Sequence, residues 1–141
     1  MKRLKEFFDR HQWPRNIDHQ NLSFEKIESA IEISLPEDYK YFLQKYLGHG
    51  AFIGQRYVNL WRYEEVLAKN ISYEITTELD QVLGIGDNGS GELIGIEKRS
   101  EESERIILTP FIGLHSSNHI WIGNSFTDFL IRLDASKEWY T

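Results

Sequence analysis

The stretch of residues 34–50 predicts one helix whose start, buried face and end can all be recognised. Pro36 suits the first helical turn, where its missing N–H leaves no hydrogen bond unmade, and the acidic pair after it stabilises the positive end of the helix. Apolar residues then recur with a 3.6-residue period on one side of the helix: Tyr39, Phe42, Leu43, Tyr46 and Leu47. Gly48 can adopt the left-handed conformation that commonly ends a helix. We therefore expect a helix that ends at Gly48 and packs one face against a core.

The rest of the chain predicts further helices near both ends and strands between them. Residues 1–13 predict a short amphipathic helix, and residues 23–31 predict a second one. Residues 87–91 tolerate positive φ and predict a tight turn between two strands, whereas Ser125 is placed to cap a last helix. The segments expected to be extended are 57–61, 82–86, 92–97, 105–109 and 111–122. Because short connections favour hairpins, we expect one α+β domain over residues 1–141, with a mainly antiparallel sheet of about five or six strands and helices mostly on one face.

Three segments together resemble a known family. They are the helix of residues 34–50, the glycine- and aspartate-rich turn in residues 83–96, and the Ser-Phe-x-x-Phe-Leu pattern in residues 124–130. In this order they resemble the SUKH superfamily, which includes Smi/Knr-type cell-wall regulators and bacterial toxin-immunity proteins. The resemblance extends over about residues 24–133 and implies a SUKH-like fold. None of the three segments is a catalytic signature, so the resemblance informs fold more than chemistry.

Acidic residues are concentrated in the middle of the chain. The net charge is −6, and residues 64–104 contain eleven acidic residues against three basic ones. Nucleic-acid affinity comes largely from Lys and Arg that neutralise phosphates, so we expect this segment to repel nucleic acid and to attract a basic protein. The alternative is a solvated acidic surface that only keeps the protein in solution.

Composition also limits where the protein works. The chain has no cysteine, which excludes disulfides and cysteine-ligated zinc and fits a reducing compartment. No apolar stretch of the N-terminal segment has the form of a signal peptide, and no later one reaches membrane-spanning length. We therefore expect a cytoplasmic protein whose first helix docks on its own core rather than on a membrane.

Motifs that could carry chemistry have simpler structural explanations. Residues 84–89 match G-x-G-x-x-G by letter, but a dinucleotide site needs a helix after the turn, and residues 92–96 predict a strand. His115 and His119 have a spacing that suits zinc on a helix, but Ser-Ser-Asn between them opposes a helix and no third ligand is indicated. Neither a serine nucleophile motif nor a cysteine is present, and pairs of acids are expected by chance in so acidic a segment. We expect no catalytic residue, no metal and no cofactor.

Aromatic residues and acids in the strand region supply candidate contacts for a partner. Tryptophan and tyrosine on a strand pack in the core when they point inward, and they dominate protein-binding hot spots when they are exposed. The resulting set of candidate partner-binding residues is Trp61, Glu74, Glu78, Asp80, Asp87, Glu92 and Trp121.

The resemblance and the acidic middle lead to three hypotheses about function. The first is a non-catalytic immunity protein that binds and blocks a cognate bacterial toxin domain, a basic protein expected to be a nuclease. The second is a regulatory scaffold similar to the family's cell-wall regulators. The third is a small enzyme that uses Asp87, Glu92 or His119.

Overall fold

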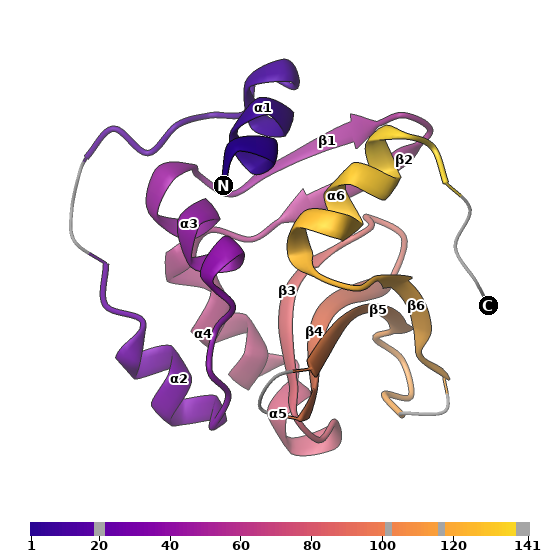
Figure 1. Cartoon of the computed structure of the whole chain (residues 1–141). Helices are drawn as coiled ribbons and strands as arrows, with labels where there is room; N and C mark the ends of the chain where they lie inside the picture. Colours follow the sequence, from indigo (N-terminus) through magenta and orange to yellow (C-terminus); the bar gives the residue numbers. More distant parts are fainter. Residues whose placement is uncertain (19–21, 101–102, 116–117, 138–141) are drawn as a thin grey trace.

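The computed structural model describes residues 1–18, 22–100, 103–115 and 118–137, which form an α+β fold around a six-stranded antiparallel sheet. The strand order follows the sequence, so each strand pairs with its neighbours along the chain (Figure 1). The strands are β1 (His49–Ile53), β2 (Arg56–Leu60), β3 (Val82–Asp87), β4 (Glu92–Ser100), β5 (Ser103–Pro110) and β6 (Ile120–Gly123). The helices are α1 (Lys2–Arg10), α2 (Glu25–Ile31), α3 (Glu37–Lys45), α4 (Tyr63–Ser72), α5 (Ile75–Glu78) and α6 (Phe126–Asp134). The predicted α+β class with an antiparallel sheet is confirmed.

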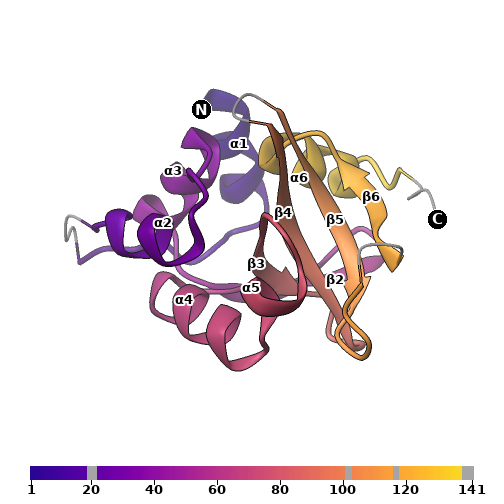
Figure 2. The ribbon, with the colours of Figure 1, turned by 90° about the horizontal axis from the view of Figure 1, so that it is seen from below.

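The centre of the sheet is buried without interruption. Residues 82–86 of β3 and 93–96 of β4 are all buried. The helices α4 and α5 pack against β3, and α6 packs against β5 and β6. Figure 2 shows the curled sheet with α2, α3 and α4 gathered on one side of it. This cover explains why β3 and β4 carry continuous apolar runs instead of alternating apolar and polar residues.

A buried asparagine fixes α4 to the sheet. Asn70 is fully buried; its Oδ1 accepts a hydrogen bond from the Gly84 N–H at 2.7 Å, and its Nδ2 donates to the Gly84 carbonyl at 2.9 Å. A Cβ atom at position 84 would lie 2.8 Å from Cδ1 of Ile75, so the site has no room for a side chain. Glycine therefore lets α4 and α5 approach β3 closely.

The N-terminal helix docks on an aromatic part of the core, as its apolar stripe predicts. Leu4, Phe7 and Phe8 of α1 are buried. The ring of Phe8 lies 5.2 Å from that of Phe42 and 4.5 Å from that of Tyr46, measured between centroids. Rings packed in this way add specific stabilisation to the burial of their area. The first helix is thus part of the folded core.

The predicted end of the third helix is wrong. The helix α3 ends at Lys45, because Tyr46 is already extended (φ −132°) and pairs with Arg15 in an isolated antiparallel bridge. Leu47 consequently points outward and is 38% exposed. Gly48 does not serve as a left-handed cap; instead, a Cβ there would lie 2.3 Å from the backbone nitrogen of Arg62. The glycine is needed for a close backbone approach rather than for ending the helix.

Elsewhere, the predicted helices and turns agree with the structure where the sequence signal comes from neighbouring residues. The last helix is confirmed, with Ser125 Oγ accepting a hydrogen bond from the Asp128 N–H at 3.0 Å. The hairpin between β3 and β4 is also confirmed. Strand β1 and helix α5 were not predicted. Among the described residues of the segment predicted to be extended, 111–122, only those from Ile120 onward form a strand, β6, which ends at Gly123.

Candidate protein-binding surface

The carboxylate of Asp87 holds the turn between β3 and β4. Its Oδ2 accepts hydrogen bonds from Trp61 Nε1 at 2.9 Å and from Asn59 Nδ2 at 3.1 Å. Its Oδ1 accepts one from the backbone N–H of Gly89 at 2.9 Å. Gly89 has φ +74°, a backbone conformation that residues other than glycine rarely adopt. Asp87 therefore ties the end of β2, the end of β3 and the turn into one rigid unit.

Exposed aromatic rings lie on one side of this turn. Phe52 on β1 is 70% exposed, and its ring centroid lies 5.3 Å from that of Tyr57 on β2. A Cβ atom on Gly89 would lie 2.8 Å from the ring of Tyr57, so the tyrosine ring rests directly on the backbone of the turn. The hairpin of β1 and β2 thus presents two aromatic side chains beside the carboxylates of the turn.

A second aromatic pair lies where the chain after β5 meets the turn. The backbone N–H of Phe111 donates to the Gly91 carbonyl at 3.0 Å, which fixes the chain after β5 against the turn. The Phe111 ring lies 5.1 Å from that of Tyr73, which is 47% exposed. Within the turn, Glu92 accepts a hydrogen bond from Asn88 Nδ2 at 2.8 Å.

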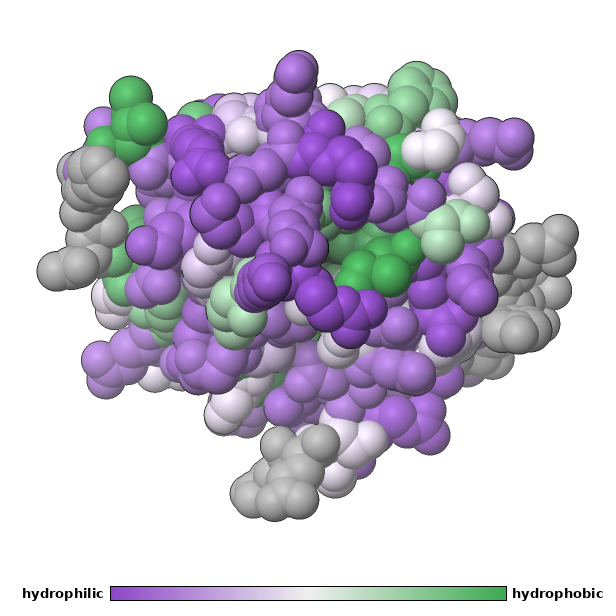
Figure 3. Space-filling view, turned by 45° about the horizontal axis from the view of Figure 1, so that its top comes forward, coloured by the Kyte–Doolittle hydropathy of each residue, from purple (hydrophilic) through white to green (hydrophobic). Residues whose placement is uncertain are grey.

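We call this combination the turn surface: Phe52, Tyr57, Tyr73, Asp87, Glu92 and Phe111. Phe52, Tyr57 and Tyr73 are exposed, whereas Phe111 is half-buried against the core. Exposed aromatic residues commonly serve as anchors for another protein. Figure 3 shows a face of the molecule on which hydrophilic side chains predominate and apolar areas are small and separated. Small aromatic groups among carboxylates are typical of a reversible interface rather than of an obligate one.

The structure disperses the residues that the sequence suggested as partner contacts. Trp61 is 1% exposed, so it belongs to the core and acts through its bond to Asp87 rather than as a surface anchor. Glu74 is exposed and directly follows Tyr73. Trp121 is half-buried on β6, with the Arg132 guanidinium 4.3 Å above its ring. Asp87 and Glu92 meet in the turn surface, whereas Trp121 lies apart from them on the edge strand of the sheet.

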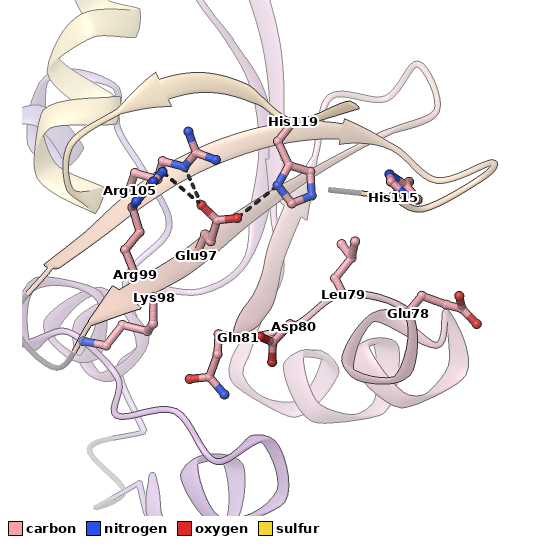
Figure 4. A pocket seen from close by; sticks show the side chains of 10 residues that line it. All are labelled: Glu78, Leu79, Asp80, Gln81, Glu97, Lys98, Arg99, Arg105, His115 and His119. Carbon is pink, nitrogen blue, oxygen red and sulfur yellow. Dashed lines mark hydrogen bonds and ion pairs between the residues drawn. The ribbon is translucent and has the colours of Figure 1, made fainter. Parts of the chain in front are cut away.

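Glu78 and Asp80 line a separate cleft of about 580 Å³ between the end of α5 and strands β4 and β5. Figure 4 shows this cleft from close by. Glu97 lies at one end, where it pairs with Arg105 Nε at 2.5 Å and with His119 Nδ1 at 3.1 Å. The His119 side chain is only 2% exposed, and its Nε2 has no hydrogen-bond partner among the described residues.

The protonation states in this cleft follow from burial and charge. Burial lowers the pKa of His119, and the nearby carboxylate of Glu97 opposes that shift without cancelling it. Burial also disfavours the charged form of Glu97, but its hydrogen bond and charge interaction with Arg105 outweigh this, so the pKa of Glu97 is lowered. An ionised Glu97 accepts a hydrogen bond from the Nδ1–H of a neutral His119 imidazole, which leaves Nε2 as a hydrogen-bond acceptor.

Other chemistry that the sequence suggested is not supported by the geometry. The glycines of residues 84–89 lie in a hairpin, and the strand β4 occupies the place where a dinucleotide site would need a helix. His115 and His119 belong to no group of three or more His, Asp or Glu side chains that could hold a metal, as far as the described residues extend. Among the described helices, none combines the length and the apolar character needed to cross a bilayer.

Sequence reasoning missed two features of these sites. Phe52 escaped notice because strand β1 is short and glycine-containing, and nothing local marks its direction. The pairing of Glu97 with His119 joins residues 22 positions apart, and it depends on how β4, β5 and the segment before β6 lie side by side. Only the register of the sheet could have revealed it.

Comparison with known proteins agrees with this fold. Residues 21–132 match the model of the SMI1 / KNR4 family (SUKH-1). No curated protein matches the chain as a relative.

Proposed function

We propose, because the chain belongs to the SMI1 / KNR4 family (SUKH-1), that it is a non-catalytic immunity protein that neutralises a bacterial toxin domain by binding it. The family is consistent with immunity or regulatory roles. The observation that carries the proposal is the turn surface, where exposed aromatic rings flank the carboxylates of Asp87 and Glu92 on a rigid hairpin. We place the encounter in the cytoplasm and expect the toxin to be a nuclease.

Charge favours a basic partner. Glu74, Glu78 and Asp80 are exposed and form no salt bridge with any described residue. Unpaired surface carboxylates steer a positively charged protein during diffusional encounter and repel nucleic acid. Nucleases that bind nucleic acid carry the opposite charge pattern, since they neutralise phosphates with Lys and Arg. An acidic surface would therefore speed the association of inhibitor and toxin.

Catalysis by the protein itself has little support. Both carboxylate oxygens of Asp87 already accept hydrogen bonds that hold the turn. Glu92 is engaged with Asn88 at the same turn. Asp87 and Glu92, which the enzyme hypothesis would use, thus form hydrogen bonds that hold the turn. His119, the third residue of that hypothesis, lies in a different part of the molecule, the cleft beside β4. Binding alone accounts for an inhibitor without a reaction.

Co-expression with the protein encoded beside this chain tests the proposal. The wild-type chain should restore growth of cells that produce a toxic neighbour, and the two proteins should purify as a complex. Replacing Phe52 and Tyr57 by alanine should weaken binding about ten-fold or more, since exposed aromatic anchors commonly contribute over 1 kcal/mol. Ile17→Ala is the matched control, because Ile17 is an apolar side chain that is 76% exposed outside the turn surface.

The regulatory scaffold is the alternative that the same experiment separates. A neighbour that binds through the turn surface but is harmless to cells favours the scaffold. No binding by the neighbour, or equal binding by the aromatic double variant, contradicts the proposed interface.

A further inference from the structure

Ion pairs are concentrated at one end of the cleft beside β4. Arg99 and Arg105 gather around Glu97 at one end in Figure 4, with ion-pair distances to the Glu97 carboxylate of 3.8 and 2.5 Å. Lys98 is 3.8 Å from Glu104, so the basic side chains of this end each face a carboxylate. The three basic side chains thus share two carboxylates, those of Glu97 and Glu104.

The other end offers carboxylate acceptors that form no ion pair with a described cation. Glu78 and Asp80 come from the end of α5 and the residues after it, and neither forms a salt bridge with a described residue. Leu79 lies between them in the sequence and also lines the cleft. Figure 4 shows His119 with Nδ1 turned to Glu97 and Nε2 turned to the side of Leu79 and His115.

The orphaned nitrogen of His119 is the feature that indicates a ligand. The imidazole is almost fully buried, it is held by Glu97, and its Nε2 lacks a partner in the described part of the chain. A buried acceptor without a hydrogen bond costs about 1–3 kcal/mol, so a donor that reaches it recovers this energy. The exposed carboxylates of Glu78 and Asp80, which line the same cleft, favour a cationic donor.

We propose that this cleft receives a lysine or arginine side chain of the protein partner. The charged head faces the acidic end of the cleft, and one N–H of the head donates to Nε2 of His119. That this side chain comes from a toxin rests on the proposed function. The preference of the cleft for a cation is independent of that function, since a lysine or arginine side chain of any peptide would fit it.

Small peptides test the chemistry without a partner. We would titrate ¹⁵N-labelled protein with Nα-acetyl-lysine methylamide and Nα-acetyl-arginine methylamide, and follow the imidazole nitrogens of His119 and the backbone amides of Leu79 and Gln81. The neutral control is Nα-acetyl-norleucine methylamide, which keeps the stem and lacks the charge, and Nα-acetyl-glutamate methylamide is the anionic control. Saturable shifts with a cationic peptide, absent with both controls, are the expected result.

Variants assign the response to the proposed groups. Glu78→Gln with Asp80→Asn should weaken binding of the cationic peptide about five-fold or more, and both positions are exposed, so folding is retained. Glu74→Gln is the matched control, an exposed carboxylate directly before α5 and outside the cleft, and it should not change peptide binding. His119→Asn keeps a donor for Glu97 but lacks Nε2, and it should lose the response while its spectrum remains that of a folded protein.

The outcomes separate this site from the proposed function. Equal shifts with the norleucine or glutamate peptide, or no shifts with any peptide, overturn the cleft as a cation site whether or not a toxin binds. If the neighbouring toxin binds the wild type and the Glu78 and Asp80 double variant equally, the occupant is not its side chain. If the cationic peptides bind and no neighbouring protein does, the proposed function fails while the cleft stands as a site for basic side chains.

Discussion

Removing the carboxylate of Asp87 should destabilise the whole fold, although the residue lies at a turn. The change Asp87→Ala deletes the acceptor for Trp61 Nε1, for Asn59 Nδ2 and for the backbone N–H of Gly89. The indole of Trp61 is 1% exposed, so its N–H would be left without water or protein as a partner. A lost hydrogen bond to a charged acceptor costs about 1.5–3 kcal/mol.

The three hydrogen bonds contribute unequally to the free energy of unfolding. Asn59 is only half-buried and Gly89 is exposed, so water replaces the carboxylate there at small cost. We therefore expect Asp87→Ala to lower the free energy of unfolding by about 2–4 kcal/mol, and Asp87→Asn by about 1–2 kcal/mol, because one amide oxygen can still serve Trp61. Asp80→Asn removes an exposed carboxylate that forms no salt bridge with a described residue, and it should change stability by less than about 0.5 kcal/mol.

Urea unfolding at neutral pH, followed by circular dichroism, measures these differences. A double-mutant cycle with Trp61→Phe isolates the bond, since the cost of Asp87→Ala should fall by about 1 kcal/mol or more when the indole N–H is already absent. Equal costs of Asp87→Ala in the two backgrounds, or wild-type stability of Asp87→Ala itself, would refute the assignment of Asp87 as the acceptor that holds the turn.

The remaining predictions concern the core, the cleft and the turn. Leu43→Ala should cost about 2–5 kcal/mol in urea unfolding, whereas Leu47→Ala should be near neutral because the helix ends before it; comparable costs would contradict that boundary. The lowered pKa of His119 means that the unfolded chain takes up a proton first, so stability should fall as the pH drops below about 6.5, and the lowered pKa of Glu97 adds a further loss below about 4.5. His119→Gln should flatten the first part of this profile in thermal melts at several pH values, and an unchanged profile would show that another group causes it. Gly89→Ala should both lower the melting temperature and displace Tyr57, because φ is +74° and the new Cβ would meet the ring; a variant with wild-type stability and partner affinity would contradict this contact.

Local signals in the sequence were sufficient for the elements whose cause is local. The capping bond of Ser125 and the positive φ of Gly89 depend on residues within a few positions, and the last helix and the β3–β4 turn follow from them. The end of α3 depends instead on Tyr46, which leaves the helix to pair with Arg15 in an isolated bridge. Gly48, which is a suitable residue to end a helix, gives no indication of that distant contact.

The binding surface was less accessible to sequence reasoning, because strand faces depend on register. Tyr57, Asn59 and Trp61 alternate on one face, yet they pass from exposed to buried along it. Composition marked Trp61 as a possible anchor, and the structure makes it the donor that holds Asp87. Phe52 and Tyr57, which are exposed, became visible as a pair only once β1 and β2 were known to form a hairpin.

The central claim, neutralisation of a partner by binding alone, is tested most directly by titrating the activity of the purified neighbouring toxin domain with the purified chain. The expected curve falls linearly and reaches full inhibition at equimolar amounts, with both proteins recovered chemically unchanged by mass spectrometry. Inhibition should slow as the salt concentration rises, because steering by the acidic surface is screened. Complete loss of toxin activity at far less than equimolar chain, with a modified toxin or product, would contradict the claim and show that the protein acts as an enzyme.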